Sequence, residues 1–142
     1  MNNALISIKP PYVEQILSGI KTVELRRQPM NLTAGARLWI YSTLPKGCIE
    51  AVATIASIEV GSPSLLWRKH GRSMGITYAH FCAYLLGSKT ALAITLNDIK
   101  RLRHPLTLAQ LRTEHKVFHP PQSFIHLENK PSLLNTLNRS RI

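Results

Sequence analysis

The apolar segments of this chain are short, and this feature constrains its fold more than any other. Nine prolines and seven glycines interrupt its 142 residues, and no stretch approaches the ~18 consecutive apolar residues that a membrane span needs. Hydrophobic residues still make up 44% of the chain and occur along its whole length, which excludes general disorder. The length fits one domain with its own core. We therefore expect a compact domain of short elements that does not enter a membrane.

Alternation of apolar and polar residues indicates six strands. In the first, Ala4, Ile6 and Ile8 alternate with Leu5 and Ser7. The six predicted strands cover residues 4–8, 22–27, 37–42, 48–60, 90–96 and 122–127.

Start and stop signals predict short helices between these strands. Pro10 and Pro11 open the first helix, and Gly19 is placed to end it in the left-handed conformation. The next helices begin after Ser62 and after Thr77. Thr107, followed three residues later by Gln110, forms a capping box for another.

The order of these elements predicts the fold class. The strands do not alternate with long helices, so a doubly wound parallel sheet is not expected. We expect an α+β fold, a small mixed β-barrel flanked by short helices, that covers residues 1–128. Residues 129–142 are polar and basic and are predicted to form a flexible tail, in which Leu133, Leu134 and Leu137 favour at most a loose helix.

The charge balance points to an anionic partner. Eighteen Lys and Arg stand against seven Asp and Glu, a net charge of +11 that is spread through the chain. A folded domain this basic typically meets a polyanion, most often a nucleic acid. Neither a signal peptide nor a cysteine framework is apparent, so a cytoplasmic location is expected.

The densest cluster of polar residues lies directly after the first predicted helix. In the strand of residues 22–27, Glu24 and Arg26 share one face, while Val23 and Leu25 face the core. Lys21 stands at the turn before this strand, and Lys9 precedes the helix. Such a group can bind phosphate and keep a carboxylate charged. Spacing alone equally fits a solvated strand face with charge pairs.

The run SIKPPYVEQILSGIKTVELRR resembles the start of the ASCH domain, a branch of the PUA-like superfamily. That family has a G-x-K-x-x-x-x-R pattern after its first helix, which Gly19, Lys21 and Arg26 match. The later pieces WIYST, SPSLLWRKHG, ALAITLNDIKRL and PPQSF follow in the same order. The likeness covers roughly residues 3–128 and is strongest to bacterial and phage ASCH proteins described as predicted regulators.

The resemblance implies a barrel with a basic cleft that binds RNA or a modified nucleoside or nucleotide, with DNA as an alternative partner. The residues expected at this cleft come from the matched motif and from neighbouring polar and aromatic positions: Lys9, Tyr12, Gly19, Lys21, Thr22, Glu24, Arg26, Tyr41, Gln122 and Ser123. Tyr12 and Tyr41 are the candidates for stacking on bases, whereas Trp39 and Trp67 are expected in the core.

Some relatives with this motif are enzymes, so the sequence leaves open whether the cleft only binds or also hydrolyses. One branch deacylates acetylated cytidine and another is a ribonuclease; in either case Lys21 and Glu24 would be catalytic here. The deacylating branch has Thr three residues after the Lys and a downstream Glu. Here Glu24 replaces that Thr, and the downstream Glu is either Glu50 or Glu59.

Nothing in the sequence predicts a metal or a cofactor. His115 and His119 are four residues apart, but Pro120 follows them and no acidic ligand lies between them. Cys48 and Cys82 are isolated, and no phosphate-binding glycine motif occurs.

Overall fold

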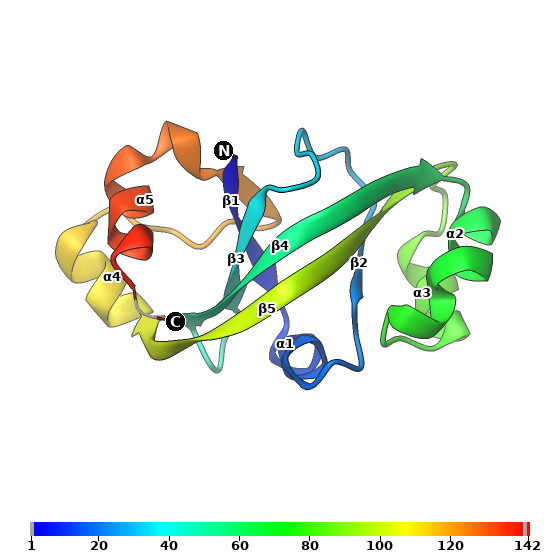
Figure 1. Cartoon of the computed structure of the whole chain (residues 1–142). Coiled ribbons are helices and arrows are strands. Elements are labelled where there is room, and N and C mark those ends of the chain that lie inside the picture. The colour runs from blue at the N-terminus through cyan, green and yellow to red at the C-terminus, as the bar shows by residue number, and fades with distance from the viewer. Residues whose placement is uncertain (1, 141) are drawn as a thin grey trace.

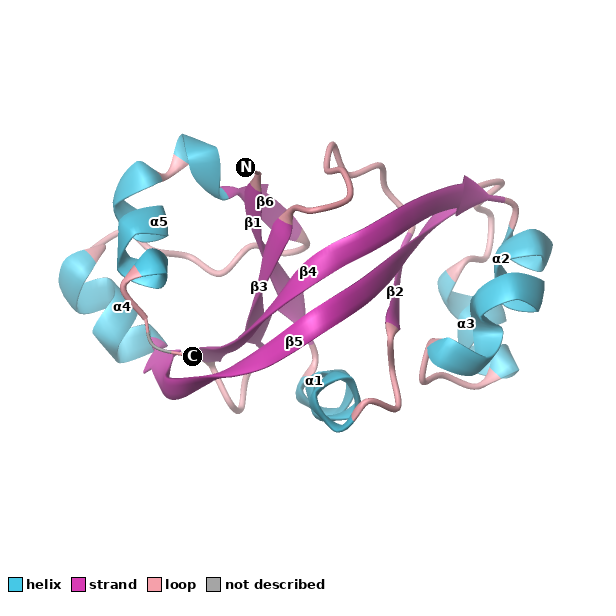
Figure 2. Cartoon of the chain, in the orientation of Figure 1, coloured by secondary structure: helices cyan, strands magenta, loops and turns pink. Residues whose placement is uncertain are grey.

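The computed structural model describes residues 2–140 and 142, which form one six-stranded sheet with helices at both ends (Figures 1 and 2). The strands are β1 (Asn3–Ile8), β2 (Val23–Arg26), β3 (Arg37–Ser42), β4 (Cys48–Gly61), β5 (Ala91–Thr107) and β6 (Phe124–His126). The α-helices are α1 (Pro10–Ser18), α2 (Pro63–His70), α3 (Tyr78–Tyr84), α4 (Leu108–Glu114) and α5 (Pro131–Asn138). Two short 3-10 helices, η1 (Gly71–Ser73) and η2 (Leu127–Asn129), complete the chain.

The sheet has the order β2-β5-β4-β3-β1-β6 and curls into a half-barrel. Strands β1 and β3 are parallel, and every other neighbouring pair is antiparallel. The expected α+β class, a small mixed barrel with short helices around it, is confirmed. Strands β2 and β6 are the two edges of the sheet, and an open seam separates them.

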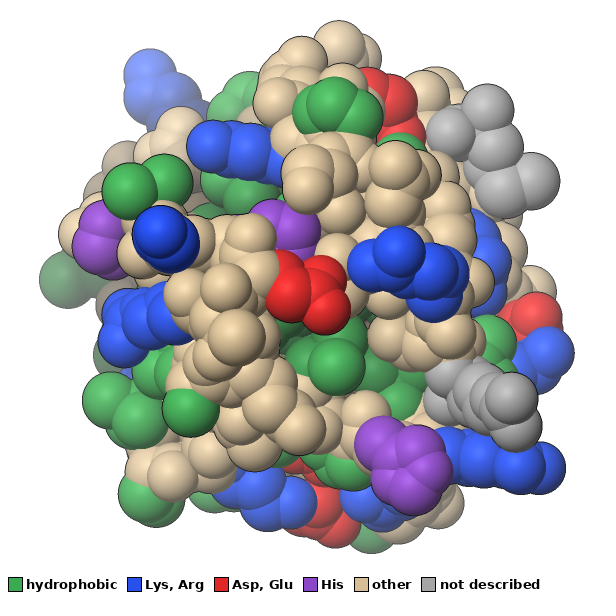
Figure 3. All heavy atoms as spheres, turned by 90° about the vertical axis from the view of Figure 1, so that its left-hand side faces the viewer, with side chains coloured by type: hydrophobic (Ala, Val, Ile, Leu, Met, Phe, Trp, Pro, Cys, Tyr) green, Lys and Arg blue, Asp and Glu red, His purple; other side chains and the backbone are tan. Residues whose placement is uncertain are grey.

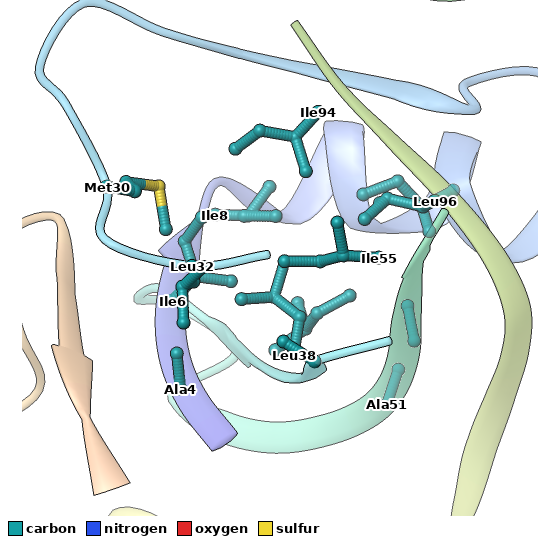
Figure 4. Packing of buried hydrophobic residues seen from close by; sticks show 14 of the residues in the cluster. Ala4, Ile6, Ile8, Met30, Leu32, Leu38, Ala51, Ile55, Ile94 and Leu96 are labelled. Atoms are coloured by element: carbon teal, nitrogen blue, oxygen red, sulfur yellow. The ribbon is translucent and has the colours of Figure 1, made fainter. Parts of the chain in front are cut away.

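The hollow of the half-barrel is filled by the first of three apolar clusters. Ile6 and Ile8 of β1 point into it, together with Leu38 of β3, Ile55 of β4 and Ile94 of β5 (Figure 4). Helix α1 closes the hollow with Val13 and Ile16, which are buried at helical spacing. Each of these strands thus has one apolar face inside the curl, as the alternation predicts.

A second cluster covers the opposite face of the sheet, under α4 and α5. It contains Leu5 of β1 and Trp39 of β3, whose neighbours in the strand point into the first cluster. The expected capping box between Thr107 and Gln110 is present at the start of α4. Figure 3 views this end of the molecule and shows Lys and Arg side chains scattered among acidic and apolar ones.

The third cluster joins β2 to the pair of helices α2 and α3. Val23 and Leu25 pack there with Leu66 of α2 and Phe81 of α3. Ser62 and Thr77 cap these two helices through their side-chain oxygens, as the sequence predicts. This packing determines which residues of β2 face the helices. The alternate residues, Glu24 and Arg26, therefore face the seam.

Strand β5 extends well beyond the predicted residues 90–96. Ala91 and Ala93 pack in the third cluster, whereas Leu102 packs in the second, so the strand crosses the molecule between them. Exposed polar residues fill its middle, and Asp98 has a positive φ of 49° there. The alternation of apolar and polar residues therefore stops in the middle of β5, although the backbone hydrogen bonds between β5 and β4 continue beyond it. At the other edge, β6 is shorter than the predicted residues 122–127.

Helix α5 lies within the segment predicted to be a tail. Leu133 and Leu137 are buried in the second cluster, so this helix contributes to the core. The division of the chain after residue 128 remains a prediction. Among the described residues, no helix is both long and apolar enough to cross a membrane.

Replacing Leu137 with Ala tests whether α5 belongs to the core. Leu137 is fully buried, so we expect a loss of about 2–5 kcal/mol in the free energy of unfolding, measured by urea denaturation. Leu86→Ala is the matched control, because Leu86 is 84% exposed, and it should change stability by less than about 0.5 kcal/mol. Equal small losses in both variants would show that residues 129–142 behave as a tail.

Candidate functional site

A cleft of about 730 Å³ lies over the open seam of the half-barrel. One wall is the end of β1 and the start of α1, and the opposite wall is β2 with the following loop. Helix α3 and the segment before β6 contribute the remainder. The lining residues are Ser7, Ile8, Lys9, Tyr12, Lys21, Glu24, Leu25, Arg26, Arg27, Gln28, Thr43, Ile76, His80, Ala83, Tyr84, Gln122 and Ser123.

Lys21 is buried at the base of this cleft, where only 3% of it is exposed. Gly19 ends α1 with a φ of 87°, which turns the chain back so that the Lys21 N–H donates to the Gln15 carbonyl. The ammonium donates to the carbonyl oxygens of Val23, at 3.0 Å, and Met74, at 2.6 Å. Its Nζ is also 3.3 Å from Glu24 Oε1. Lys21 occupies the turn that the sequence predicts, but its ammonium has three internal partners there.

Glu24 links the two cations of the matched motif. Its Oε2 accepts from Arg26 Nε at 2.8 Å and lies 2.6 Å from Arg26 Nη2, while Oε1 faces Lys21. The Glu24 side chain is only 9% exposed, and that of Arg26 is 13% exposed. Because two cations flank one carboxylate, the group carries a net positive charge and fixes the carboxylate in one orientation. We call Lys21, Glu24 and Arg26 the charged triad.

Arg26 also spans the seam between the two edges of the sheet. Its Nη2 donates to the Ser7 carbonyl on β1 at 2.9 Å, and its Nη1 donates to Ser123 Oγ at 3.4 Å. Ser7 in turn donates from Oγ to the Pro121 carbonyl at 2.6 Å. The guanidinium therefore tethers β2 to the β1–β6 edge at the bottom of the cleft.

Seven of the ten residues expected at the site line this cleft: Lys9, Tyr12, Lys21, Glu24, Arg26, Gln122 and Ser123. Tyr12 lies over the triad, with the Lys21 ammonium 5.4 Å from the centre of its ring. These seven residues come from different segments of the chain, and the fold brings them together at one cleft, as the sequence predicts.

Gly19, Thr22 and Tyr41 are not among the residues that line the cleft. Gly19 acts as the helix cap, and the backbone of Thr22 bonds to Ser73 and Leu96. Tyr41 is only 2% exposed and packs in the second cluster, where burial raises the pKa of its hydroxyl. Tyr41 is therefore a core residue, because the parity of β3 directs it away from the hollow.

Neither downstream glutamate lines the cleft. Glu50 is buried on β4, with its Oε1 3.5 Å from Lys46 Nζ and 3.6 Å from Arg101 Nη1. Glu59 binds Lys69 at 2.8 Å and His70 at 2.7 Å, and the hydrogen bonds from these partners lower its pKa. The structure thus gives the triad no second carboxylate from either position.

Sequence reasoning missed the contribution of α3 to the cleft. His80 and Tyr84 are four residues apart on the face of α3 that borders the cleft. Arg27 lies 5.1 Å from the centre of the Tyr84 ring and also lines the cleft. The spacing around the buried Phe81 could have shown that both residues lie on an exposed side of the helix, but not that this side faces the cleft. Within residues 2–140 and 142, no group of three His, Cys, Asp or Glu could hold a metal ion.

Comparison with known proteins identifies the family. A model of the ASCH domain matches residues 6–117. The chain belongs to the ASCH domain family. A protein of Zymomonas mobilis called an ASCH domain-containing ribonuclease is 35% identical over 127 residues, which are 89% of this chain and 85% of that protein.

Solved structures agree on the fold of this ASCH chain. The crystal structure of ASCH from Zymomonas mobilis matches with a TM-score of 0.88 and 33% identity, over 97% of this chain and 95% of that one. The human THYN1 protein, solved in complex with 5-methylcytosine-containing DNA, matches over 100% of both chains with a TM-score of 0.59. Its identity is only 12%, so it supports the fold alone.

The burial of Lys21 predicts that Lys21→Ala destabilises the fold. The variant leaves two carbonyl oxygens without their donor and removes one cation from a buried carboxylate. We expect a loss of about 1–3 kcal/mol in the free energy of unfolding, measured by urea denaturation.

Lys9→Ala is the matched control, because Lys9 lines the same cleft but is exposed. It should change stability by less than about 0.5 kcal/mol. If the two lysine variants unfold at the same urea concentration, the Lys21 hydrogen bonds contribute nothing to stability.

Proposed function

We propose that this ASCH protein binds single-stranded RNA, with one nucleotide seated in the cleft above the charged triad. The observation that carries the proposal is the convergence of Lys21, Glu24 and Arg26 at the bottom of one cleft. Burying a charged side chain alone is costly, and here the pairing of opposite charges offsets that cost. The resulting group has fixed donors and acceptors facing a volume typical of small-ligand sites, about 300–1,000 Å³.

The polar groups of the cleft suit the parts of a nucleotide. Glu24 offers carboxylate lone pairs to the amino group of a base, and Ser123 offers a hydroxyl. Arg26 Nη1 makes only a long contact, of 3.4 Å to Ser123 Oγ, so it is the best-placed donor for a phosphate or carbonyl oxygen. Lys9 and Arg27 are exposed at the rim and add positive charge for the flanking phosphates.

Two aromatic side chains supply surfaces for stacking. Tyr12 and Tyr84 both line the cleft, from α1 and α3. Stacking on aromatic rings is the common way in which proteins bind unpaired bases. The site thus combines aromatic stacking with positive charge, the two contributions on which the binding of single-stranded nucleic acid depends.

A related protein supports a nucleic-acid partner. The Zymomonas mobilis protein, which is 35% identical, is called a ribonuclease. RNA is our choice over DNA because this relative is named for its action on RNA. A modified nucleoside remains a narrower version of the same proposal.

Ribonuclease activity is the second candidate, and the name of the 35% identical relative favours it. Glu24 would take the proton of a ribose 2′-hydroxyl, whose oxygen attacks the neighbouring phosphorus. Arg26 would stabilise the charge that develops on the phosphate oxygens. The bond to the 5′-oxygen breaks, and this oxygen takes a proton from His80, which leaves a 2′,3′-cyclic phosphate and a 5′-hydroxyl.

Deacylation of acetylated cytidine fits this cleft less well. Glu24 stands where the deacylating relatives have Thr, and Thr22 does not line the cleft. A carboxylate held between two cations is a poor acceptor for an acyl group compared with a base-assisted hydroxyl. Of the two reactions, we therefore propose the cleavage of RNA.

RNA binding is tested by fluorescence anisotropy with a labelled single-stranded RNA across a salt series. Replacing both Lys9 and Arg27 with Ala should weaken binding and lower the log–log salt slope by about 0.7 for each phosphate that is no longer neutralised. The control replaces Arg103 and Lys116, two exposed cations outside the cleft, and should keep a steeper slope. A wild-type affinity that does not change with salt would contradict the proposal.

Cleavage is tested with purified protein and an RNA whose fragments are separated by electrophoresis. Glu24→Gln should lower the cleavage rate by about 10²–10⁴-fold, since it removes the general base. Glu114→Gln, far from the cleft on α4, is the matched control and should keep the wild-type rate.

A fully 2′-O-methylated RNA should bind but remain intact, because its 2′-oxygen carries no proton. Cleavage of that RNA, or an unchanged rate in Glu24→Gln, would contradict the mechanism. Neither result would affect the binding proposal, which the salt series tests separately.

A further inference from the structure

A second groove of about 730 Å³ lies beside the cleft, between α1, α2 and the segment that leads into α3. Ile76 lines both the groove and the cleft, so the two adjoin at this residue. Helix α3 borders both, with Tyr78 in the groove and His80 and Tyr84 in the cleft. Helices α2 and α3 lie together at one end of the molecule, next to β2 (Figure 1).

The groove contains a fixed aromatic surface. Tyr78 is 59% exposed, yet its ring is supported by Trp67 at 5.1 Å and by Phe81 at 6.4 Å between ring centres. Trp67 is held in turn by Phe81 at 4.8 Å and by the backbone of Gly71. A Cβ at Gly71 would lie 2.7 Å from the Trp67 ring, so glycine is required for this close approach. The Tyr78 ring is thus positioned by packing while much of it remains open to solvent.

The groove is also positively charged. Arg68 and Arg72 are exposed and line it, and no acidic side chain is among its described lining residues. Elsewhere in α2, Lys69 and His70 are paired with Glu59. Across the residues that the structure describes, Arg68 and Arg72 form no such ion pair. Their charge is therefore available to an anion.

We propose that this groove is a second nucleotide subsite, into which a single-stranded RNA continues from the cleft by passing over Ile76. A base stacks on Tyr78, while Arg68 and Arg72 contact the phosphates on either side of it. The inference rests on the proposed function of the cleft and extends the bound RNA by at least one nucleotide. A mononucleotide would occupy the cleft alone, whereas a longer strand would reach both sites.

The test compares Tyr78→Ala with wild type on two ligands, a labelled mononucleotide and a labelled decanucleotide RNA. Because stacking on one aromatic ring is worth about 1–3 kcal/mol, affinity for the decanucleotide should fall by about fivefold to about 140-fold. Affinity for the mononucleotide should stay unchanged. Tyr78→Phe keeps the ring and should restore decanucleotide binding, and melting curves of both variants establish whether the fold is intact.

Arg72→Ala tests the charge contribution, with Arg103→Ala on the distant half of β5 as the matched control. Arg72→Ala should lower the log–log salt slope of decanucleotide binding by about 0.7, and Arg103→Ala should leave it unchanged. If Tyr78→Ala binds the decanucleotide as wild type does, the second subsite is refuted and the cleft is unaffected. If the wild type binds neither ligand, the proposed function itself fails.

Discussion

The contact of Arg26 with Glu24, Ser7 and Ser123 is the interaction on which the site depends. The sheet of this protein does not close, so β2 and the β1–β6 edge face each other with backbone groups that no further strand pairs. Arg26 supplies side-chain donors where a strand would supply amide donors. The same guanidinium orients Glu24, so the group that ties the seam together also sets the chemistry of the cleft.

A buried group of this kind needs complete internal pairing. Moving a carboxylate and two cations out of water is expensive unless each one finds partners, and here backbone carbonyls complete the set. The free-energy cost of removing its ammonium from water explains why Lys21 donates hydrogen bonds to the carbonyls of Val23 and Met74 and is not left free for a ligand. Lys21 then acts chiefly on Glu24, by fixing its orientation, while Arg26 and the rim residues Lys9 and Arg27 remain better placed to meet phosphate.

Much of this arrangement could be predicted from the sequence, because it depends on local patterns. Alternation in residues 22–27 places Glu24 and Arg26 on one face, and the Gly19 cap determines where α1 ends. Tyr41 shows the limit of such reasoning, since its place near a strand end fits an exposed ring. Only the packing of α4 and α5 on the sheet reveals that this side of β3 is covered.

Long-range packing accounts for the other differences. Strand β5 continues through exposed polar residues because Leu102 anchors its second half, a contact that no local pattern reports. The same holds for Leu137, whose burial needs a partner cluster built from strands far away in sequence. His80 and Tyr84 escaped prediction for a related reason, because the glycine–lysine–arginine motif ends at Arg26 and α3 reaches the cleft only in three dimensions.

The segment from Gly71 to Tyr84 connects the triad to the outer wall of the site. Lys21 donates to the Met74 carbonyl, and the next residues, Gly75 and Ile76, separate the cleft from the second groove. Gly75 has a φ of 69°, and a Cβ there would clash with Gln15 Oε1, so the wall lies tightly against α1. A shift of this wall would break the Lys21 hydrogen bond to Met74 or the close approach of Gly75 to Gln15. The wall between the two sites is therefore joined to the charged triad by the Lys21 hydrogen bond and to Tyr78 by the chain itself, since Met74 and Tyr78 are only four residues apart.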